Sequence, residues 1–148
     1  MLTRRTVLGG LAITPFLPTA ALAAKPEVFA VDGLAIRGVD PVAYFKKSVP
    51  VRGSANHVAT WKGATWQFEN AENLAMFQAD PEAFAPKYGG YCAYAVSKGG
   101  TATTDPEAWT IYEDRLYLNF NLTVRGIWSE DIPGNVAKAD ANWPGVLA

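Results

Sequence analysis

The chain has 148 residues, of which 49% are hydrophobic and 18% are charged, and 13 basic residues face 14 acidic ones. This length fits one globular domain whose core needs no disulfide or metal to hold it together. Because nucleic-acid-binding domains carry a strongly basic surface, the slightly acidic balance excludes that class of partner.

The first 23 residues have the layout of an export signal. Arg4 and Arg5 precede an apolar run at residues 7–17, and small residues stand at the cleavage positions in 21–23. The run is too short and too interrupted for a membrane span. The paired arginines favour twin-arginine export across the bacterial inner membrane, the alternative being an ordinary secretory signal. Residues 24–148 would then form one periplasmic domain with a net charge of −3 and no membrane span.

Residues 25–39 are predicted to be extended, with a turn at Asp32-Gly33. An Asp-Pro pair occurs three times along the chain, each time followed by an aromatic residue four positions after the Asp. Asp caps a helix and Pro suits its first turn, so each pair predicts a helical turn. The aromatic residue would fold back onto the core. These three expected core residues are Tyr44, Phe84 and Trp109.

Residues 47–56 are polar and rich in turn formers, which predicts a loop. Two strands are expected at 57–61 and 65–68, because both runs are rich in β-formers and a Lys-Gly-Ala turn separates them. Asn70 is then expected to cap a helix over residues 71–79.

The second half predicts another helix at residues 91–97 and a hairpin whose turn is Glu113-Asp114. The tail at residues 122–143 has helical spacing that Pro133-Gly134 interrupts, which predicts two helices. Hairpins and helices without alternating βαβ units indicate an α+β fold. We therefore expect a small single domain of antiparallel hairpins packed with short helices, ending in a helical tail.

Cys92 is the single cysteine, and it lies in the glycine- and tyrosine-rich segment KYGGYCAYAVSKGG. A lone cysteine in an exported protein is a buried bystander, an intermolecular partner or a functional thiol. If the helix begins at Gly90 or Tyr91, Cys92 lies in its first turn, where unpaired N–H groups stabilise a thiolate. Its spacing of four residues from Val96 fits burial equally well.

The residues around Cys92 suggest a binding site. The glycines permit a close approach of a ligand to the backbone, and the tyrosine hydroxyls can donate hydrogen bonds. The candidate binding residues are Tyr88, Gly89, Gly90, Tyr91 and Tyr94.

The sequence contains few side chains that could act as ligands in a metal site. His57 is the single histidine, and Met76 is the single methionine after the predicted signal. With Cys92 they offer the ligand types that suit a soft transition metal such as copper, although surface and packing roles are the alternatives. A closed zinc site needs four Cys or His ligands, so a site in one chain would be open, assisted by carboxylates or shared between protomers.

Four segments carry a family resemblance: GVDPVAYF, WKGATWQFENAENLAMFQADPEAFAPKYGGYCAYAVSKG, DPEAWTIYEDRLYLNFN and ADANWPG. Together they resemble the exported bacterial YHS-domain proteins over almost all of the chain after the signal. The resemblance implies a small module related to those found beside heavy-metal transporters and some oxygenases. It also implies thiol or selenol chemistry at Cys92, because some close relatives read selenocysteine at the matching position.

The sequence departs from the metal-linked members of that family. Those relatives carry Cys-Gly after Asp-Pro-Val, whereas this chain has Ala43 and Tyr44 there. Polar residues replace the thiols expected around the helix after the second hairpin strand, and His57 stands where the family's histidine is expected. The polar replacements are Glu69, Asn70 and Asn73.

Three functional hypotheses follow. In the first, the protein is a periplasmic metal-associated module that binds copper at Cys92, with His57 as a second ligand. In the second, Cys92 is a catalytic redox thiol that reacts with peroxide or forms mixed disulfides. In the third, the domain is a non-catalytic accessory module for an unidentified protein partner, and Cys92 is a packing residue.

Overall fold

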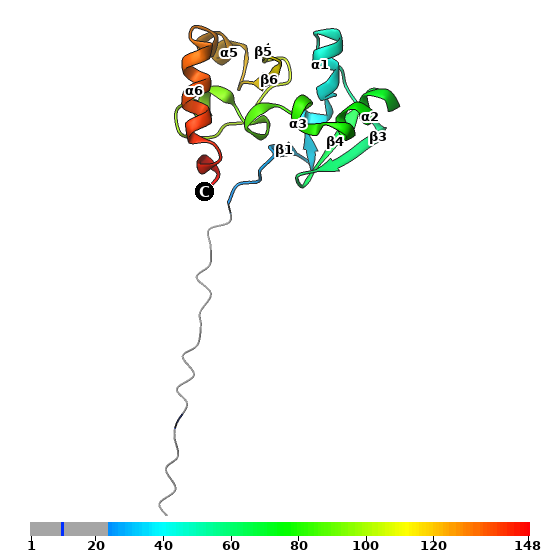
Figure 1. Ribbon diagram of the computed structural model, residues 1–148, viewed down its shortest axis with the longest axis horizontal. Coiled ribbons are helices and arrows are strands. Elements are labelled where there is room, and N and C mark those ends of the chain that lie inside the picture. The colour runs from blue at the N-terminus through cyan, green and yellow to red at the C-terminus, as the bar shows by residue number, and fades with distance from the viewer. Residues whose placement is uncertain (1–9, 11–23) are drawn as a thin grey trace, which may run out of the picture.

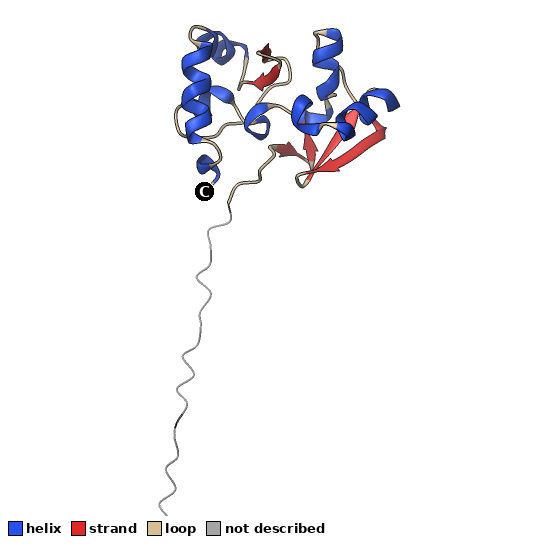
Figure 2. Ribbon diagram, in the orientation of Figure 1, coloured by secondary structure: helices blue, strands red, loops and turns tan. Residues whose placement is uncertain are grey.

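The computed structural model describes residue 10 and residues 24–148. The predicted export signal, apart from Gly10, lies outside these residues. The described chain forms an α+β fold in which two β-sheets are packed with short helices (Figures 1 and 2). None of the described helices has the length and apolar character needed to cross a bilayer.

The first sheet has the strand order β1-β2-β4-β3. Strands β1 (Ala30–Val31) and β2 (Leu34–Ala35) form a short hairpin around the predicted Asp32-Gly33 turn, and β2 pairs in parallel with β4 (Ala64–Phe68). Strand β3 (Ser54–Trp61) is antiparallel to β4. The loop predicted at residues 47–56 is therefore wrong at its end, because Ser54 already pairs with the last residue of β4.

Two helices of this half begin at the predicted caps. The Asp40 carboxylate accepts hydrogen bonds from the backbone of α1 (Pro41–Lys47), and the Asn70 side chain caps α2 (Ala71–Ala79). The bounds of α2 confirm the prediction from sequence. The other oxygen of Asp40 accepts from the backbone N–H of Glu69 and the side-chain amide of Asn73, both at 2.8 Å. This buried carboxylate therefore ties α1 to the start of α2.

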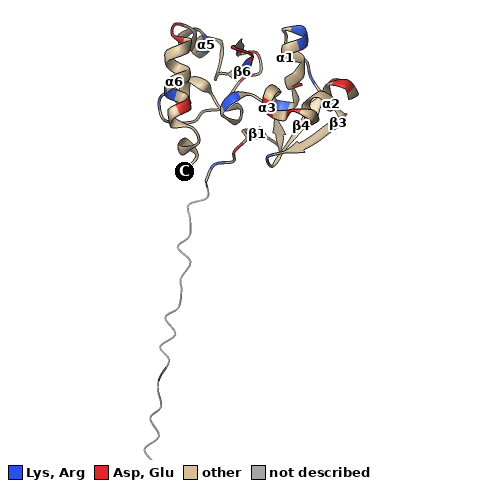
Figure 3. Cartoon of the chain, in the orientation of Figure 1, with Lys and Arg blue, Asp and Glu red and all other residues tan. Residues whose placement is uncertain are grey.

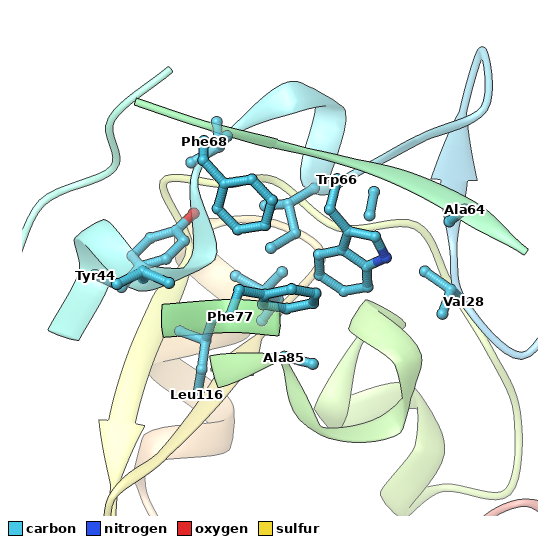
Figure 4. Close-up of a cluster of buried hydrophobic side chains, with 13 residues drawn as sticks. Val28, Tyr44, Ala64, Trp66, Phe68, Phe77, Ala85 and Leu116 are labelled. Atoms are coloured by element: carbon cyan, nitrogen blue, oxygen red, sulfur yellow. The ribbon is translucent and has the colours of Figure 1, made fainter. Parts of the chain in front are cut away.

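The first hydrophobic cluster lies between the sheet, α1 and α2 (Figure 4). Its largest buried side chains include Trp66, Phe68, Phe77 and Leu116. Tyr44 is fully buried in it, as predicted, and donates a hydrogen bond to the carbonyl of Pro106 at 2.8 Å. Of the other predicted core residues, Phe84 and Trp109 pack against the edge of this cluster and are partly buried.

The three Asp-Pro pairs do not all start helices. The second precedes the single-turn helix α3 (Pro81–Phe84), as expected. The third forms only a turn, in which the Asp105 carboxylate accepts from the Glu107 backbone N–H. The helical prediction is wrong there because the chain enters strand β5 (Trp109–Tyr112) two residues later.

The predicted hairpin of the second half is confirmed, with β5 antiparallel to β6 (Arg115–Leu118). The tail forms two helices, α5 (Leu122–Ser129) and α6 (Ile132–Asn142), before the short 3₁₀ turn Gly145–Leu147. The break between them falls at Asp131 rather than at Pro133-Gly134. The Asp131 side chain caps α6, and Pro133 fits in the first turn of that helix.

A second hydrophobic cluster lies beneath α6 and includes Tyr88, Val96, Tyr117 and Trp128. The segment that joins the two clusters contains a 3₁₀ turn, η2 (Lys87–Gly90), and the five-residue helix α4 (Ala93–Ser97). Figure 1 shows α5 and α6 at one side of the molecule and the four-stranded sheet with α1 and α2 at the other. Basic and acidic positions are interspersed over both sides (Figure 3).

Candidate functional site

Cys92 lies inside the protein, where only 1% of its surface is exposed. Its sulfur is 3.5 Å from the side-chain oxygen of Asn119, and its backbone N–H donates to the Ala102 carbonyl at 3.0 Å. The expected placement in the first helical turn is wrong. Helix α4 begins at Ala93, because Gly90 has a φ of 83° and the next residue is extended, so Cys92 only flanks the helix.

The other proposed metal ligands lie on different elements. His57 is partly buried on β3, an edge strand of the first sheet, and Met76 packs against the first cluster from α2. Within the described residues, no group of three or more His, Cys, Asp or Glu side chains is placed to share a metal ion. The structure thus leaves Cys92 with Asn119 as its side-chain partner.

Two of the predicted binding residues, Tyr88 and Gly89, line a pocket of about 360 Å³. We call it the Tyr88 pocket. Its deeper wall is formed by buried side chains of Val28, Trp66 and Ala85. The pocket opens to solvent on the side where glutamates from the N-terminal segment and from α3 stand, with 55% and 65% of their side-chain surfaces exposed.

Lys62, in the turn between β3 and β4, binds the two glutamates at this opening. Its ammonium nitrogen is 3.0 Å from a carboxylate oxygen of Glu27 and 3.1 Å from one of Glu82. Partial burial lowers the pKa of Lys62, but the hydrogen bonds and charges of the two glutamates outweigh this effect and raise it overall. Lys62 therefore stays protonated and joins three separate segments at the mouth of the pocket.

A second charged group includes Tyr88 itself. The Tyr88 hydroxyl donates to a carboxylate oxygen of Asp140 on α6 at 2.9 Å, and the Lys87 ammonium lies 3.1 Å from the same oxygen. Burial, followed by the hydrogen bond to Asp140, raises the pKa of Tyr88 well above its ordinary value, so the phenol keeps its proton. The backbone of Tyr88 has φ = 61° and ψ = 34°, a left-handed conformation that is strained for a bulky residue.

Arg115, the first residue of β6, also lines the pocket. Its Nε is buried, and within the described part of the chain that N–H has no hydrogen-bond partner. The ion pairs found among the described residues also leave its guanidinium without a carboxylate. Its charge acts on Tyr88, where it opposes the larger effect of burial on the pKa.

Gly89 sets the distance between the pocket wall and the N-terminal segment. Its φ is +63°, and a Cβ added there would collide with the backbone carbonyl oxygen of Glu27. The Gly89 carbonyl accepts a hydrogen bond from the Phe29 N–H at 2.9 Å. Only glycine allows this approach, which places Glu27 at the pocket.

The remaining predicted binding residues have structural partners outside the pocket. The Gly90 carbonyl accepts from the Thr104 hydroxyl, and the Tyr91 hydroxyl donates to the Pro26 carbonyl, both at 2.7 Å. Tyr94 is partly buried against the second cluster.

Sequence reasoning missed several residues that the fold brings to the pocket. Arg115 begins a strand, while Asp140 and Trp143 come from α6 and its end. No local motif marks them, because they are separated from Tyr88 by 27 to 55 positions in the chain. The available signal was the concentration of tryptophans, three of which line the pocket.

Comparisons of the chain with models of protein families, with curated proteins and with solved structures gave no match. The resemblance to YHS-domain proteins accordingly stays a prediction.

Proposed function

We propose that this protein is an exported YHS-type accessory module that binds a small ligand in the Tyr88 pocket without changing it chemically. The main support for the proposal is the pocket itself, where Tyr88 and Gly89 lie beside charged and aromatic side chains. Its volume of about 360 Å³ lies within the range of small-molecule sites, which are mostly apolar with a few placed polar groups.

The backbone around the pocket supports a binding role. Tyr88 holds a strained conformation, and Gly89 accepts a contact that no other residue permits. Such strain persists only where the surrounding structure enforces it, and it concentrates at ligand-binding sites. Ion pairs among the lining residues add to this pre-organisation, since Lys62 binds two glutamates and Lys87 binds Asp140. A pre-formed site binds its ligand with little ordering cost.

Cys92 has a packing role in this proposal. Its sulfur is buried beside Asn119, and the adjoining backbone is fixed by the hydrogen bond to Ala102. This placement favours the accessory-module hypothesis. The copper and redox hypotheses stay predictions, and both require that a metal ion or an oxidant reach a sulfur of which 1% is exposed.

The five tryptophans that follow the predicted signal provide a direct test. Trp61, Trp66 and Trp143 line the pocket, whereas Trp109 packs at the edge of the first cluster and Trp128 is buried in the second. In a titration of the ¹⁵N-labelled protein with a library of small organic fragments, ligands in the pocket should shift the three lining indole N–H signals and leave the other two unchanged.

The two tryptophans outside the pocket are the internal control, because general effects of the added compounds would move all five signals. The proposal is contradicted if no fragment moves the lining tryptophans in preference to Trp109 and Trp128.

A further inference from the structure

Arg115 places a cationic side chain in the lining of the Tyr88 pocket. A guanidinium is charged at all relevant pH values and presents five donors in a fixed fork. The buried Nε–H of Arg115 has no acceptor within the described chain, although the group lines the pocket. A buried donor without a partner is unfavourable, and a carboxylate bound to the same guanidinium would offset this penalty.

The charges around the pocket decide which kind of anion fits. Lys62 is shared by two glutamates and Lys87 is paired with Asp140, so the basic group left to receive an anion is Arg115. One ligand carboxylate could accept two parallel hydrogen bonds from the Arg115 guanidinium. A phosphate dianion would bring a second negative charge into a pocket already lined by three carboxylates, which like-charge repulsion disfavours.

The rest of the lining indicates the body of the ligand. Three tryptophan rings reach the pocket, and Tyr88 lies beside Trp143 with ring centroids 6.0 Å apart. Aromatic side chains in this arrangement favour another ring by stacking or edge contact. A volume of about 360 Å³ lies near the lower end of small-molecule sites and suits a body of one or two rings.

We infer that the Tyr88 pocket binds a small aromatic monocarboxylate, whose carboxylate pairs with the Arg115 guanidinium and whose ring lies among the tryptophans. This inference rests on the proposed binding function and deepens it. Binding is non-covalent and involves no transfer of protons or electrons.

Two probes that share one ring and differ in charge test the inference. Indole-3-acetate is an anion and tryptamine is a cation, and each is titrated into the purified protein by calorimetry. Indole-3-acetate is expected to bind with a dissociation constant of about 1 mM or tighter, as its size permits, and tryptamine about tenfold more weakly or worse.

The variant Arg115→Gln removes the charge and keeps a hydrogen-bonding side chain. It should weaken indole-3-acetate at least about tenfold, which is the effect of losing one charge-assisted hydrogen bond. The matched control is Arg52→Gln, since Arg52 is exposed and outside the pocket, and this variant should bind as the wild type does. Circular dichroism establishes that both variants are folded.

A measurement on the wild type keeps the test valid if Arg115→Gln does not fold. The Arg115 Nε–H signal in a ¹⁵N spectrum should shift on addition of indole-3-acetate and stay in place with tryptamine. If tryptamine binds as tightly as indole-3-acetate, or the Arg115 signal does not move, the carboxylate assignment is overturned. The proposed function is contradicted by a separate result, namely that no fragment shifts the indole N–H signals of the three lining tryptophans.

Discussion

The side-chain oxygen of Asn119 lies 3.5 Å from the sulfur of Cys92 and also accepts the backbone N–H of Tyr94 at 3.0 Å. Asn119 follows strand β6 and is fully buried, so one amide oxygen joins the end of the second hairpin to the start of α4. Cys92 is thus buried against Asn119 and flanks α4, instead of lying in the first turn of the helix as the sequence predicted.

Removing this oxygen should destabilise the fold. Asn119→Ala leaves the Tyr94 N–H and the Cys92 thiol without an acceptor in a buried environment, and we expect the free energy of unfolding to fall by about 1–3 kcal/mol. Urea denaturation measures this change. Asn56→Ala is the control, because Asn56 is exposed on β3 and its loss should change stability by less than about 0.5 kcal/mol. Equal effects of the two variants would contradict a structural role for the Asn119 contact.

The burial of Cys92 predicts slow modification of the thiol. A thiol with 1% of its surface exposed reacts only when the surrounding structure opens. We expect native protein to react with iodoacetamide at least about 100-fold more slowly than protein in guanidinium at the same pH, which corresponds to an opening free energy of about 3 kcal/mol. Rapid alkylation of the folded protein would contradict the packing role and favour the redox hypothesis.

Copper analysis separates the packing role from the metal hypothesis. If Cys92 only packs, purified wild-type protein and Cys92→Ser should contain the same amount of copper after equilibration with Cu(I). Copper that is bound by the wild type and lost in Cys92→Ser, with His57→Gln giving a partial loss, would support a thiolate site instead. Both variants are checked for folding by circular dichroism before the metal is measured.

Some of the fold could be predicted because the signals are local. The Asn70 cap with the helix behind it, and the Glu113-Asp114 turn between two β-rich runs, depend on residues close together in the chain. The third Asp-Pro pair shows that a local signal is not sufficient, since Asp105-Pro106 forms only a turn before strand β5. Whether such a pair starts a helix also depends on the element that follows it.

The site could be predicted only in part, for the same reason. Tyr88 and Gly89 were visible as an unusual local segment, and both line the pocket. Arg115 and Asp140 have no local mark, because their role depends on where β6 and α6 pack against that segment. Cys92 carried the strongest local signal, but its side-chain partner, Asn119, lies 27 residues away in the chain.

Two glycines with positive φ provide a matched test of the pocket wall. Gly89→Ala meets the Glu27 carbonyl and should lower the free energy of unfolding by about 3 kcal/mol or more, since the backbone must move as well as adopt a left-handed conformation. Gly63→Ala has open space around the added Cβ and should cost only the conformational part, about 1–2 kcal/mol. Denaturant unfolding measures both, and equal losses would contradict the close contact at Gly89.

The stability of the protein at alkaline pH should depend on the protonation of Tyr88. Burial and then Asp140 raise its pKa, so the folded protein keeps the phenol proton at pH values where the unfolded chain loses it. The resulting stabilisation is fully present below the unfolded value of about 10 and is lost as the pH rises above it. The melting temperature of the wild type should therefore fall above this pH.

Tyr88→Phe has no phenol proton, and its melting temperature should fall less steeply above pH about 10. It should also be less stable at neutral pH, by about 1 kcal/mol, because the hydrogen bond to Asp140 is lost. The remaining alkaline slope reports the other groups whose pKa is raised in the folded protein, which are Tyr44, Lys62, Tyr91, Tyr112 and Tyr117. Identical alkaline slopes in the wild type and Tyr88→Phe would show that Tyr88 does not titrate as proposed.

A crystal structure of the protein soaked with indole-3-acetate tests the binding account most directly. The account predicts density for the ring between Trp143 and the buried wall of the Tyr88 pocket, with the carboxylate within hydrogen-bonding distance of the Arg115 guanidinium. A ring bound elsewhere on the protein, or a carboxylate turned to solvent while the Arg115 Nε–H stays unpaired, would contradict it.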